Sequence, residues 1–220
     1  MNSKKLFRRL AACGLSLVMI VLSTGIAAAD NSDKMSNFTD VLPGQMYYAA
    51  IEYVVTHGYF NGVSEDSFAP NDLMTRAMLV TVLGRMADVE AATYQTSRFT
   101  DVDDDSYYSG YLSWAAENDI VNGVGGDKFA PESFVTREQV AVFLYRYARH
   151  TGMDTNPGHI ASPTTFNSDS NVSTWAVAAM VWANNKGIMR GTDSGLDPQA
   201  QVTRAEVAQM IYNFSKLTEN

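Results

Sequence analysis

Residues 129–147 read FAPESFVTREQVAVFLYRY, and this stretch decides the fold because related copies of it occur twice more in the chain. Residues 68–86 read FAPNDLMTRAMLVTVLGRM, and residues 196–214 read LDPQAQVTRAEVAQMIYNF. The Thr-Arg pair inside each copy recurs after 61 residues and again after 67 residues. Self-similarity at a nearly constant period predicts an array of structural repeats.

A helix is predicted after each Thr-Arg pair. Apolar residues follow the pair at the i, i+3, i+4, i+7 spacing that forms one face of an amphipathic helix. In the second copy this face consists of Val140, Phe143, Leu144 and Tyr147. The threonine is in the N-cap position, and Gln139 and Glu206 complete a capping box that Met78 breaks in the first copy.

An earlier helix with the same spacing is predicted in each copy, starting near Tyr47, Tyr108 and Ala176. One helix pair cannot bury its apolar face alone, so the copies must pack on one another. The predicted fold class is therefore mainly α, built from three helix-loop-helix repeats. The repeats extend over residues 38–87, 99–148 and 166–214.

The first 29 residues have the order of a secretory signal peptide. A basic head at residues 4–9 precedes an apolar stretch at residues 10–26, and three alanines at residues 27–29 follow. This order predicts export with cleavage after Ala29, and an uncleaved membrane anchor is the alternative. Residues 30–37 then form a short linker before the first repeat.

Removal of this leader makes the chain strongly acidic. The leader holds four of the 16 basic residues and none of the 24 acidic ones, so the remaining chain has a formal charge of −12. Such a charge argues against nucleic acid as a partner and against simple attraction to an anionic surface. The single cysteine, Cys13, lies in the leader, which excludes disulfides and thiolate metal sites from the processed chain.

The chain carries no recognisable catalytic or metal-binding motif. It lacks the H-E-x-x-H, G-x-S-x-G and P-loop patterns, and its three histidines have spacings that suggest neither a metal site nor a triad. The acidic run at residues 101–105 fails as an EF-hand loop, because Ser106 and Leu112 stand where Gly and Glu are needed. We therefore expect no catalytic residue, metal or cofactor, and a glycan-cleaving carboxylate pair is the one enzyme hypothesis left.

The repeats resemble the S-layer homology domain. The shared pattern is F-x-D-V, an aromatic pair, G-[IVLF]-x-x-G, F-x-P and then T-R-x-[EQ] before an apolar helix, and the resemblance extends from Phe38 to Phe214. Members of that family usually carry three copies, so the resemblance implies one trilobed unit with pseudo-threefold symmetry. It also implies binding to secondary cell-wall polymers, often through a pyruvate ketal on an amino sugar, or to peptidoglycan-linked glycans.

Three arginines are the first candidate ligand-binding residues: Arg76, Arg137 and Arg204. Each stands at the first helical position, where a carboxylate would meet a guanidinium fork and oriented backbone donors. The resemblance favours such a role at two of the three sites, and the alternative is that the arginines only pair with aspartates of a neighbouring copy. Replacement by alanine is expected to weaken binding and to leave the helices intact, since alanine is at least as good a helix former.

The other candidate ligand-binding residues belong to the loops. Tyr107 and Trp175 occupy an aromatic position of the family pattern and are expected either to stack on sugar rings or to pack in the core. Asp40 and Asp101 belong to the F-x-D pattern and are expected to orient an arginine or to accept sugar hydroxyl groups. The turn glycines complete the set: Gly62, Gly123 and Gly191.

Copies one and three depart from the family pattern. Met46 stands at the aromatic position of the first copy, and Ser168 stands at the aspartate position of the third. The second copy keeps F-x-D-V, the tyrosine pair and the capping pair, although Asp119 stands where the pattern has its first glycine. Arg137 is therefore expected to have the largest effect on binding if each groove draws mainly on its own copy.

The function predicted from the sequence is that of an exported, non-catalytic module of the cell wall and cell surface. It is expected to bind a secondary cell-wall polysaccharide, pyruvylated in the favoured case, or a peptidoglycan-linked glycan, in grooves between the repeats. Neither nucleic acid nor, after removal of the leader, a membrane is an expected partner. The alternative function is a structural surface protein that assembles with other envelope proteins.

Overall fold

The computed structural model describes residues 35–94, 97–156, 171–191 and 195–218, and within these ranges the chain forms helices and no strand beyond isolated β-bridges. The helices are α2 (Tyr48–Thr56), α3 (Arg76–Met86), the 3-10 helix η1 (Ala91–Thr93), α4 (Ser109–Glu117), α5 (Arg137–His150), α7 (Val177–Asn185) and α8 (Arg204–Ser215). The predicted leader, the linker as far as residue 34 and the start of the third repeat, with Ser168, lie outside the described residues. The mainly α fold class is confirmed.

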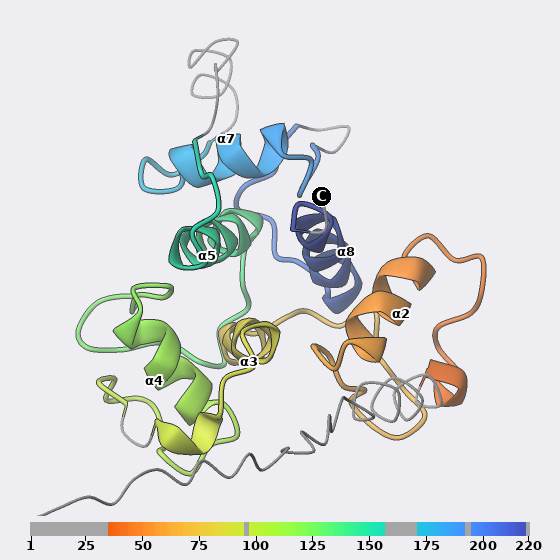
Figure 1. Ribbon diagram of the computed structural model, residues 1–220, viewed down its shortest axis with the longest axis horizontal. Helices are drawn as coiled ribbons and strands as arrows, with labels where there is room; N and C mark the ends of the chain where they lie inside the picture. Colours follow the sequence, from red (N-terminus) through yellow and green to blue (C-terminus); the bar gives the residue numbers. More distant parts are fainter. Residues whose placement is uncertain (1–34, 95–96, 157–170, 192–194, 219–220) are drawn as a thin grey trace, which may run out of the picture.

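Every repeat contributes one outer helix and one inner helix. The outer helices are α2, α4 and α7, and the inner helices α3, α5 and α8 lie together in the middle (Figure 1). Threonine N-caps start all three inner helices, and the capping boxes predicted for α5 and α8 are present. In α3 the Thr75 side chain accepts from the Met78 N–H without a box, so the cap alone is enough to start the helix.

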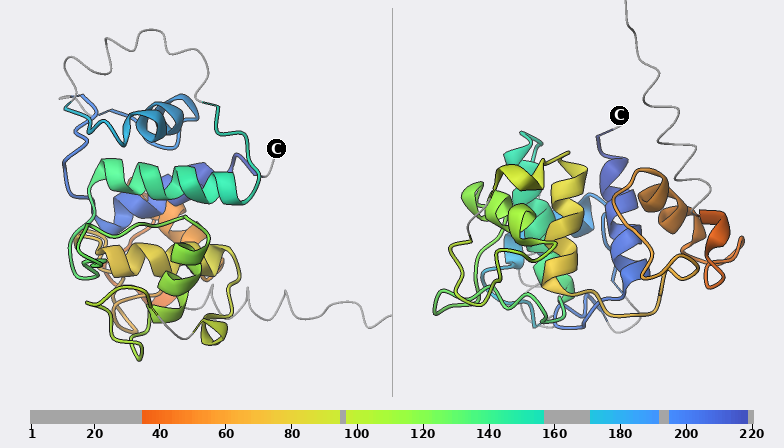
Figure 2. Two further views of the ribbon diagram at one scale, coloured as in Figure 1. Left: turned by 90° about the vertical axis from the view of Figure 1, so that its left-hand side faces the viewer. Right: turned by 90° about the horizontal axis from the view of Figure 1, so that it is seen from below.

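The inner helix of each repeat packs on the outer helix of the next repeat. Helix α3 packs on α4, α5 packs on α7, and α8 packs back on α2. The last repeat therefore closes on the first, and three lobes surround a common centre (Figures 1 and 2). This arrangement is the pseudo-threefold, three-lobed unit that the family resemblance implied.

A closed ring of backbone hydrogen bonds joins the repeats at the centre. The Met74 N–H donates to the Val202 carbonyl at 2.9 Å, Val202 donates to Val135 at 3.2 Å, and Val135 donates to Met74 at 2.9 Å. All three side chains are fully buried. Because every bond of the ring joins two different repeats, its polar groups are satisfied only when all three repeats are folded together.

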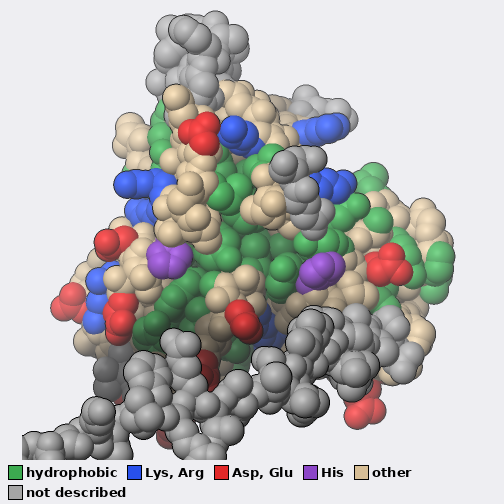
Figure 3. All heavy atoms as spheres, in the orientation of Figure 1, with side chains coloured by type: hydrophobic (Ala, Val, Ile, Leu, Met, Phe, Trp, Pro, Cys, Tyr) green, Lys and Arg blue, Asp and Glu red, His purple; other side chains and the backbone are tan. Residues whose placement is uncertain are grey.

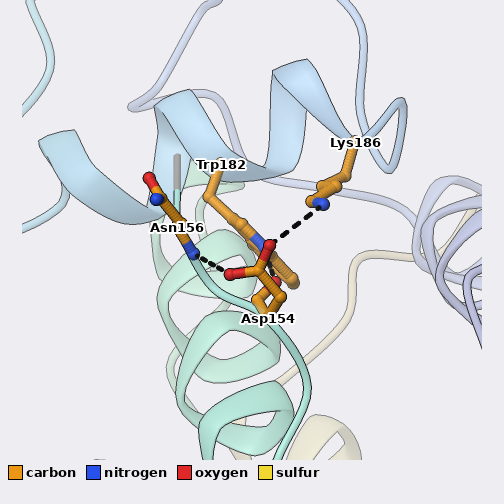
Figure 4. Close-up of polar contacts among 4 residues, drawn as sticks. All are labelled: Asp154, Asn156, Trp182 and Lys186. Atoms are coloured by element: carbon orange, nitrogen blue, oxygen red, sulfur yellow. Dashed lines mark hydrogen bonds and ion pairs between the residues drawn. The ribbon is translucent and has the colours of Figure 1, made fainter. Parts of the chain in front are cut away.

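The chain that leaves α5 is fastened to α7 at Asp154. The Trp182 Nε1–H donates to the Asp154 carbonyl at 3.3 Å, and Lys186 Nζ lies 3.9 Å from Asp154 Oδ2 (Figure 4). Trp182 is also fully buried. These contacts hold the second lobe against the third.

The face on which α8 ends is apolar in its middle and charged at its edge. Figure 3 shows hydrophobic side chains across the centre of this face, with acidic and basic side chains spread around it. Neither sign of charge gathers into a broad patch there. None of the described helices has the length and apolar character that crossing a membrane requires.

Candidate functional site

Three surface grooves lie at equivalent positions in the three repeats. Groove 1 is bounded by α3 and the loop at residues 59–63, and its volume is about 430 Å³. Groove 2 is bounded by α5 and residues 122–124, with about 370 Å³. Groove 3 is bounded by α8 and residues 187–191, with about 540 Å³. Each groove is large enough for a sugar residue or a short glycan.

Every groove is built from three repeats and not from one. To its own helix and loop it adds an arginine from the preceding repeat and a rim side chain from the following repeat. These pairs are Arg204 and Tyr107 in groove 1, Arg76 and Trp175 in groove 2, and Arg137 and Met46 in groove 3. Arg137 was expected to have the largest effect on binding if each groove drew mainly on its own copy, and the grooves do not meet that condition.

The three arginines are fixed by carbonyl groups of the next repeat. Arg76 is only 3% exposed, its Nε donates to the Phe129 carbonyl at 2.7 Å, and its Nη2 donates to the Asn122 carbonyl at 3.0 Å. The guanidinium carbon also lies 4.4 Å from the centre of the Phe129 ring. Arg137 and Arg204 make the same two kinds of hydrogen bond. They thus bridge neighbouring copies, but through carbonyl oxygens and not through the aspartates of the alternative hypothesis.

One guanidinium nitrogen of each arginine remains for a ligand. Nη1 of each arginine has no hydrogen-bond partner among the described residues. Every buried side-chain nitrogen or oxygen in that part of the chain does have a partner, so an Nη1 without one is not buried. Nη1 is therefore solvent-accessible at the groove. Burial lowers the pKa of the Arg76 guanidinium to about 10, against the opposing effect of the Asp101 charge. Arg76 still carries its positive charge at neutral pH.

The backbone donors expected at the helix starts are already occupied. The Arg76 N–H donates to the Ser133 carbonyl and the Ala77 N–H to the Pro131 carbonyl, both at 3.0 Å. The next N–H, of Met78, donates to its N-cap Thr75 at 3.2 Å. Helices α5 and α8 start in the same way. The structure thus corrects the mechanism from sequence: an anion would meet the guanidinium but not free helix-terminal N–H groups.

Two further arginines line the grooves, and the sequence reasoning missed them. Arg85 in groove 1 donates from Nη1 to the Tyr59 carbonyl at 3.3 Å. Arg146 lines groove 2, where the Asn122 amide, oriented so that its oxygen faces donors, has that oxygen 3.1 Å from both Nη atoms of Arg146. Each stands nine residues after a helix-starting arginine, and the third copy has Asn213 at that position. Comparing the three copies at this offset would have revealed the signal.

The aromatic candidates lie at the groove mouths. Tyr107 is 63% exposed and Trp175 is 57% exposed, and Met46, at the same position, is 84% exposed. Of the two interpretations from sequence, core packing does not describe these side chains. Trp114 and Trp182, which lie inside the outer helices, are buried instead. A ring that is exposed next to a groove can stack on the C–H face of a sugar.

Asp40 and Asp101 hold the F-A-P loops and do not line the grooves. Asp40 accepts from the Phe68 N–H at 2.9 Å and the Ala69 N–H at 2.7 Å, and Asp101 makes the equivalent pair. Ala69 has a φ of 56°, in the left-handed region that non-glycine residues adopt only under constraint. The carbonyl of Phe68 accepts from Arg204, so Asp40 positions an arginine indirectly, through one residue of the loop.

The three turn glycines allow the loops to pass close to one another. A Cβ on Gly62 would lie 2.5 Å from the Ser64 carbonyl oxygen, and one on Gly123 would lie 2.4 Å from the Lys128 oxygen. At Gly191 the nearest atom, the Gly195 oxygen, would be 3.0 Å away. All three glycines line a groove, so their first role is to permit its shape.

Acid is expected to weaken the loop that Asp101 holds. Burial alone would raise the pKa of Asp101, but hydrogen bonds from the Phe129 and Ala130 N–H groups bring it below its usual value. Because the folded-state pKa lies below the unfolded one, the stabilisation is complete above a pH of about 4 and is lost as the pH falls through the folded pKa. The temperature of unfolding should therefore decline less steeply with acid in Asp101→Asn than in the unchanged protein.

The control for this experiment is Asp105→Asn, which alters an exposed carboxylate in the same acidic run. It should keep the decline of the unchanged protein between about pH 6 and pH 2. Parallel declines for Asp101→Asn and the unchanged protein would contradict the role given to Asp101.

Comparison with known proteins finds the S-layer homology domain three times in this chain. The model of that family matches residues 37–77, 98–141 and 169–208. The Surface-layer 125 kDa protein of Lysinibacillus sphaericus is 26% identical over 100% of this chain, which covers 17% of that relative. The S-layer protein EA1 of Bacillus anthracis is 24% identical over 93% of the chain, which covers 22% of the relative.

A third relative is an enzyme by name. The amylopullulanase of Thermoanaerobacterium thermosulfurigenes is 27% identical over 77% of this chain, and the match covers 9% of that protein. The chain thus spans about a fifth or less of the length of these three relatives. What they share with it is the region that contains the repeats.

Proposed function

Because this chain belongs to the S-layer homology domain family, we propose that it is an exported, non-catalytic module that binds a cell-wall polysaccharide in the grooves between its repeats. One observation carries the proposal. Three equivalent grooves each combine a fixed arginine, with one guanidinium nitrogen left for a ligand, and an exposed rim side chain. The ligand class is a secondary cell-wall polysaccharide or a peptidoglycan-linked glycan.

The groove chemistry suits a sugar that carries a carboxylate. A sugar ring can stack on Tyr107 or Trp175, while its carboxylate accepts a charge-assisted hydrogen bond from Nη1 of the arginine. A pyruvate ketal on an amino sugar has both features. Since Nε and Nη2 already hold the guanidinium in place, little side-chain entropy remains to be lost on binding.

The acidic net charge of the chain does not oppose such a ligand at grooves 1 and 2. Arg85 and Arg204 line groove 1, Arg76 and Arg146 line groove 2, and no acidic residue is among the described residues that line either groove. Asp101 interacts with Arg76, and Asp72 and Asp40 interact with Arg204, without lining the grooves. The carboxylates elsewhere on the surface are screened beyond about 10 Å at ordinary ionic strength.

The named relatives support a place at the cell surface and a role other than catalysis. Two of them are a surface-layer protein and an S-layer protein, and a third is an amylopullulanase. A region shared by proteins with such different names suits a common task such as attachment. Only 9% of the amylopullulanase matches this chain, which agrees with a shared region that serves attachment and is separate from the rest of that protein.

Sedimentation with purified cell walls tests the proposal. The protein is expected to sediment with walls and to lose that binding after acid extraction of the secondary polymer. Unchanged binding to extracted walls would redirect the proposal to a peptidoglycan-linked glycan. Absence of binding to both preparations would refute it. Stable homo-oligomers in size-exclusion chromatography, together with no wall binding, would favour the rival role of a structural surface protein.

A further inference from the structure

The three grooves differ at the position nine residues after the helix-starting arginine. Arg85 and Arg146 occupy it in grooves 1 and 2, and both are half-buried against the groove wall. Groove 3 has Asn213 instead, whose Nδ2 donates to the Ile188 carbonyl at 3.1 Å. Groove 3 therefore lacks a guanidinium at this helix position, and its other lining arginine besides Arg137 is the exposed Arg190 of the loop.

A second difference places a carboxylate in groove 3. The third residue of the inner helix is Met78 in groove 1, Gln139 in groove 2 and Glu206 in groove 3. Oε2 of Glu206 accepts from the Thr203 N–H at 2.7 Å and from its hydroxyl at 3.1 Å. Oε1 of Glu206 has no partner among the described residues and is left to accept from a ligand.

Side-chain amides complete the wall of groove 3. Gln209 Nε2 donates to Asn213 Oδ1 at 2.9 Å, so the oxygen of Gln209 stays available as an acceptor. Arg190 also borders the groove, but it is exposed, and its carbonyl is what accepts from Arg137 Nη2. The acceptors of this wall match the hydroxyl and amide N–H donors of an uncharged sugar.

A sugar carboxylate would meet opposing charges in groove 3. Arg137 offers one nitrogen there, while Glu206 repels the incoming anion at close range. In grooves 1 and 2 the same anion meets two guanidinium groups, and none of the described lining residues there is acidic. The repulsive element and the missing arginine act in the same direction, which is how binding sites of similar shape acquire different specificity.

We propose that groove 3 takes a neutral sugar and rejects the anionic one, so that this chain holds charged and uncharged sugars in different grooves. The proposal rests on the proposed function, because it assigns ligand classes within the same set of grooves. Its discriminating residues are Glu206 and Asn213, with Arg85 and Arg146 as their counterparts.

Chemical-shift titration of the ¹⁵N-labelled chain separates the grooves. The two probes are the methyl glycoside of an N-acetylhexosamine with a pyruvate ketal and the same glycoside without it. The ketal probe is expected to move the amide signals of Gly62 and Gly123 and to leave that of Gly191 in place. The neutral probe is expected to move the Gly191 signal. Arg85→Gln and Arg146→Gln should each weaken ketal binding at their own groove about tenfold, the effect of one charge-assisted contact.

A gain-of-function variant provides the decisive arm. Glu206→Gln combined with Asn213→Arg gives groove 3 the groove 2 residues at these two positions, and a glutamine already completes the capping box of α5. This variant should fold and should bind the ketal probe at Gly191. It should bind walls from which the secondary polymer has been extracted no better than the unchanged protein does. Its affinity for whole walls, measured in parallel, is expected to rise about tenfold if the ketal is the charged group.

The outcomes distinguish this inference from the proposed function. The inference would be overturned if the ketal probe moved the signals of all three glycines equally. It would also be overturned if the double variant changed neither the affinity for walls nor the Gly191 shift. Either result leaves wall binding by the protein intact. Loss of wall sedimentation by the unchanged protein would remove the proposed function and the inference with it.

Discussion

Replacement of Arg204 by alanine is expected to lower the free energy of unfolding by about 3 kcal/mol or more, because two carbonyl groups each lose a charge-assisted hydrogen bond worth about 1.5–3 kcal/mol. Nε of Arg204 donates to the Phe68 carbonyl at 2.9 Å, and Nη2 donates to the Asn61 carbonyl at 2.8 Å. Its guanidinium carbon lies 4.6 Å from the centre of the Phe68 ring. All of these partners belong to the first repeat, so the variant weakens the closure of the third repeat on the first.

Urea unfolding measures this loss. Arg204→Lys should recover only part of it, because an ammonium keeps the charge but cannot form both hydrogen bonds of the guanidinium. Arg85→Ala is the matched control in the same groove, since Arg85 is half-buried and has one hydrogen bond, and it should cost less than about 1 kcal/mol. An Arg204→Ala variant as stable as this control would show that the carbonyl contacts do not hold the repeats together.

This prediction revises what the sequence suggested for the arginine variants. Helix propensity implies that alanine leaves the helices intact, and that remains true of each helix taken alone. The cost arises between repeats, where carbonyls such as that of the fully buried Phe68 lose their donor. A loss of wall binding in Arg76, Arg137 or Arg204 variants therefore needs a stability measurement beside it. Arg85 and Arg146 are cleaner probes of ligand contact.

Replacement of Gly84 by alanine is expected to destabilise the protein by about 1–3 kcal/mol, the usual cost of overpacking a core. Propensity alone predicts the opposite sign, because alanine in a helix interior is favoured over glycine by about 1 kcal/mol. A Cβ on Gly84 would lie 2.2 Å from Cδ1 and 3.0 Å from Cβ of Tyr111, on the outer helix that packs against α3. Turning the ring about its own axis leaves Cγ of Tyr111 in place, 2.9 Å from the new Cβ, so ring rotation alone does not relieve the clash.

A double-mutant cycle isolates this contact. Tyr111→Ala removes the ring, so Gly84→Ala should become neutral or stabilising in that background, and the difference between backgrounds is the coupling energy. Urea unfolding of the four proteins provides the values. The same destabilisation with and without the Tyr111 ring would exclude the clash as its cause.

The other two inner helices carry a large side chain at the position where α3 has a glycine. Tyr145 in α5 and Tyr212 in α8 stand where α3 has Gly84. Their rings lie 5.5 Å and 5.2 Å from those of Trp182 and Tyr53. Each inner helix is thus matched to one outer helix, which favours the cyclic order of the lobes over other pairings.

Much of the architecture could be predicted from the sequence because it depends on neighbours along the chain. The helix starts at Thr75, Thr136 and Thr203 follow from caps that act within three residues, and the buried faces follow from a spacing of three and four. The recurrence of these local signals was enough to predict three helix pairs that need one another for a core.

The roles of the site residues were harder to predict because they depend on contacts across the ring. Asp101 looked like a ligand residue, yet its carboxylate is occupied by the loop that supplies a carbonyl to Arg76. Arg85 and Arg146 looked like ordinary polar residues of a helix, and only the fold places them on groove walls. Sequence pattern identifies residue types, while access to a ligand depends on which neighbours cover them.

The sequence by itself determined the repeats, their helices and their caps, since those features arise from interactions over a few residues. The tertiary structure alone decided which residues share a groove. Arg204 meets the loop of the first repeat across 143 positions of the chain, and Arg137 meets that of the third across 53. No local signal specifies such partners. They follow from the closure of the last repeat on the first, because only a closed ring gives every inner helix an outer helix, and every arginine a loop, from another repeat.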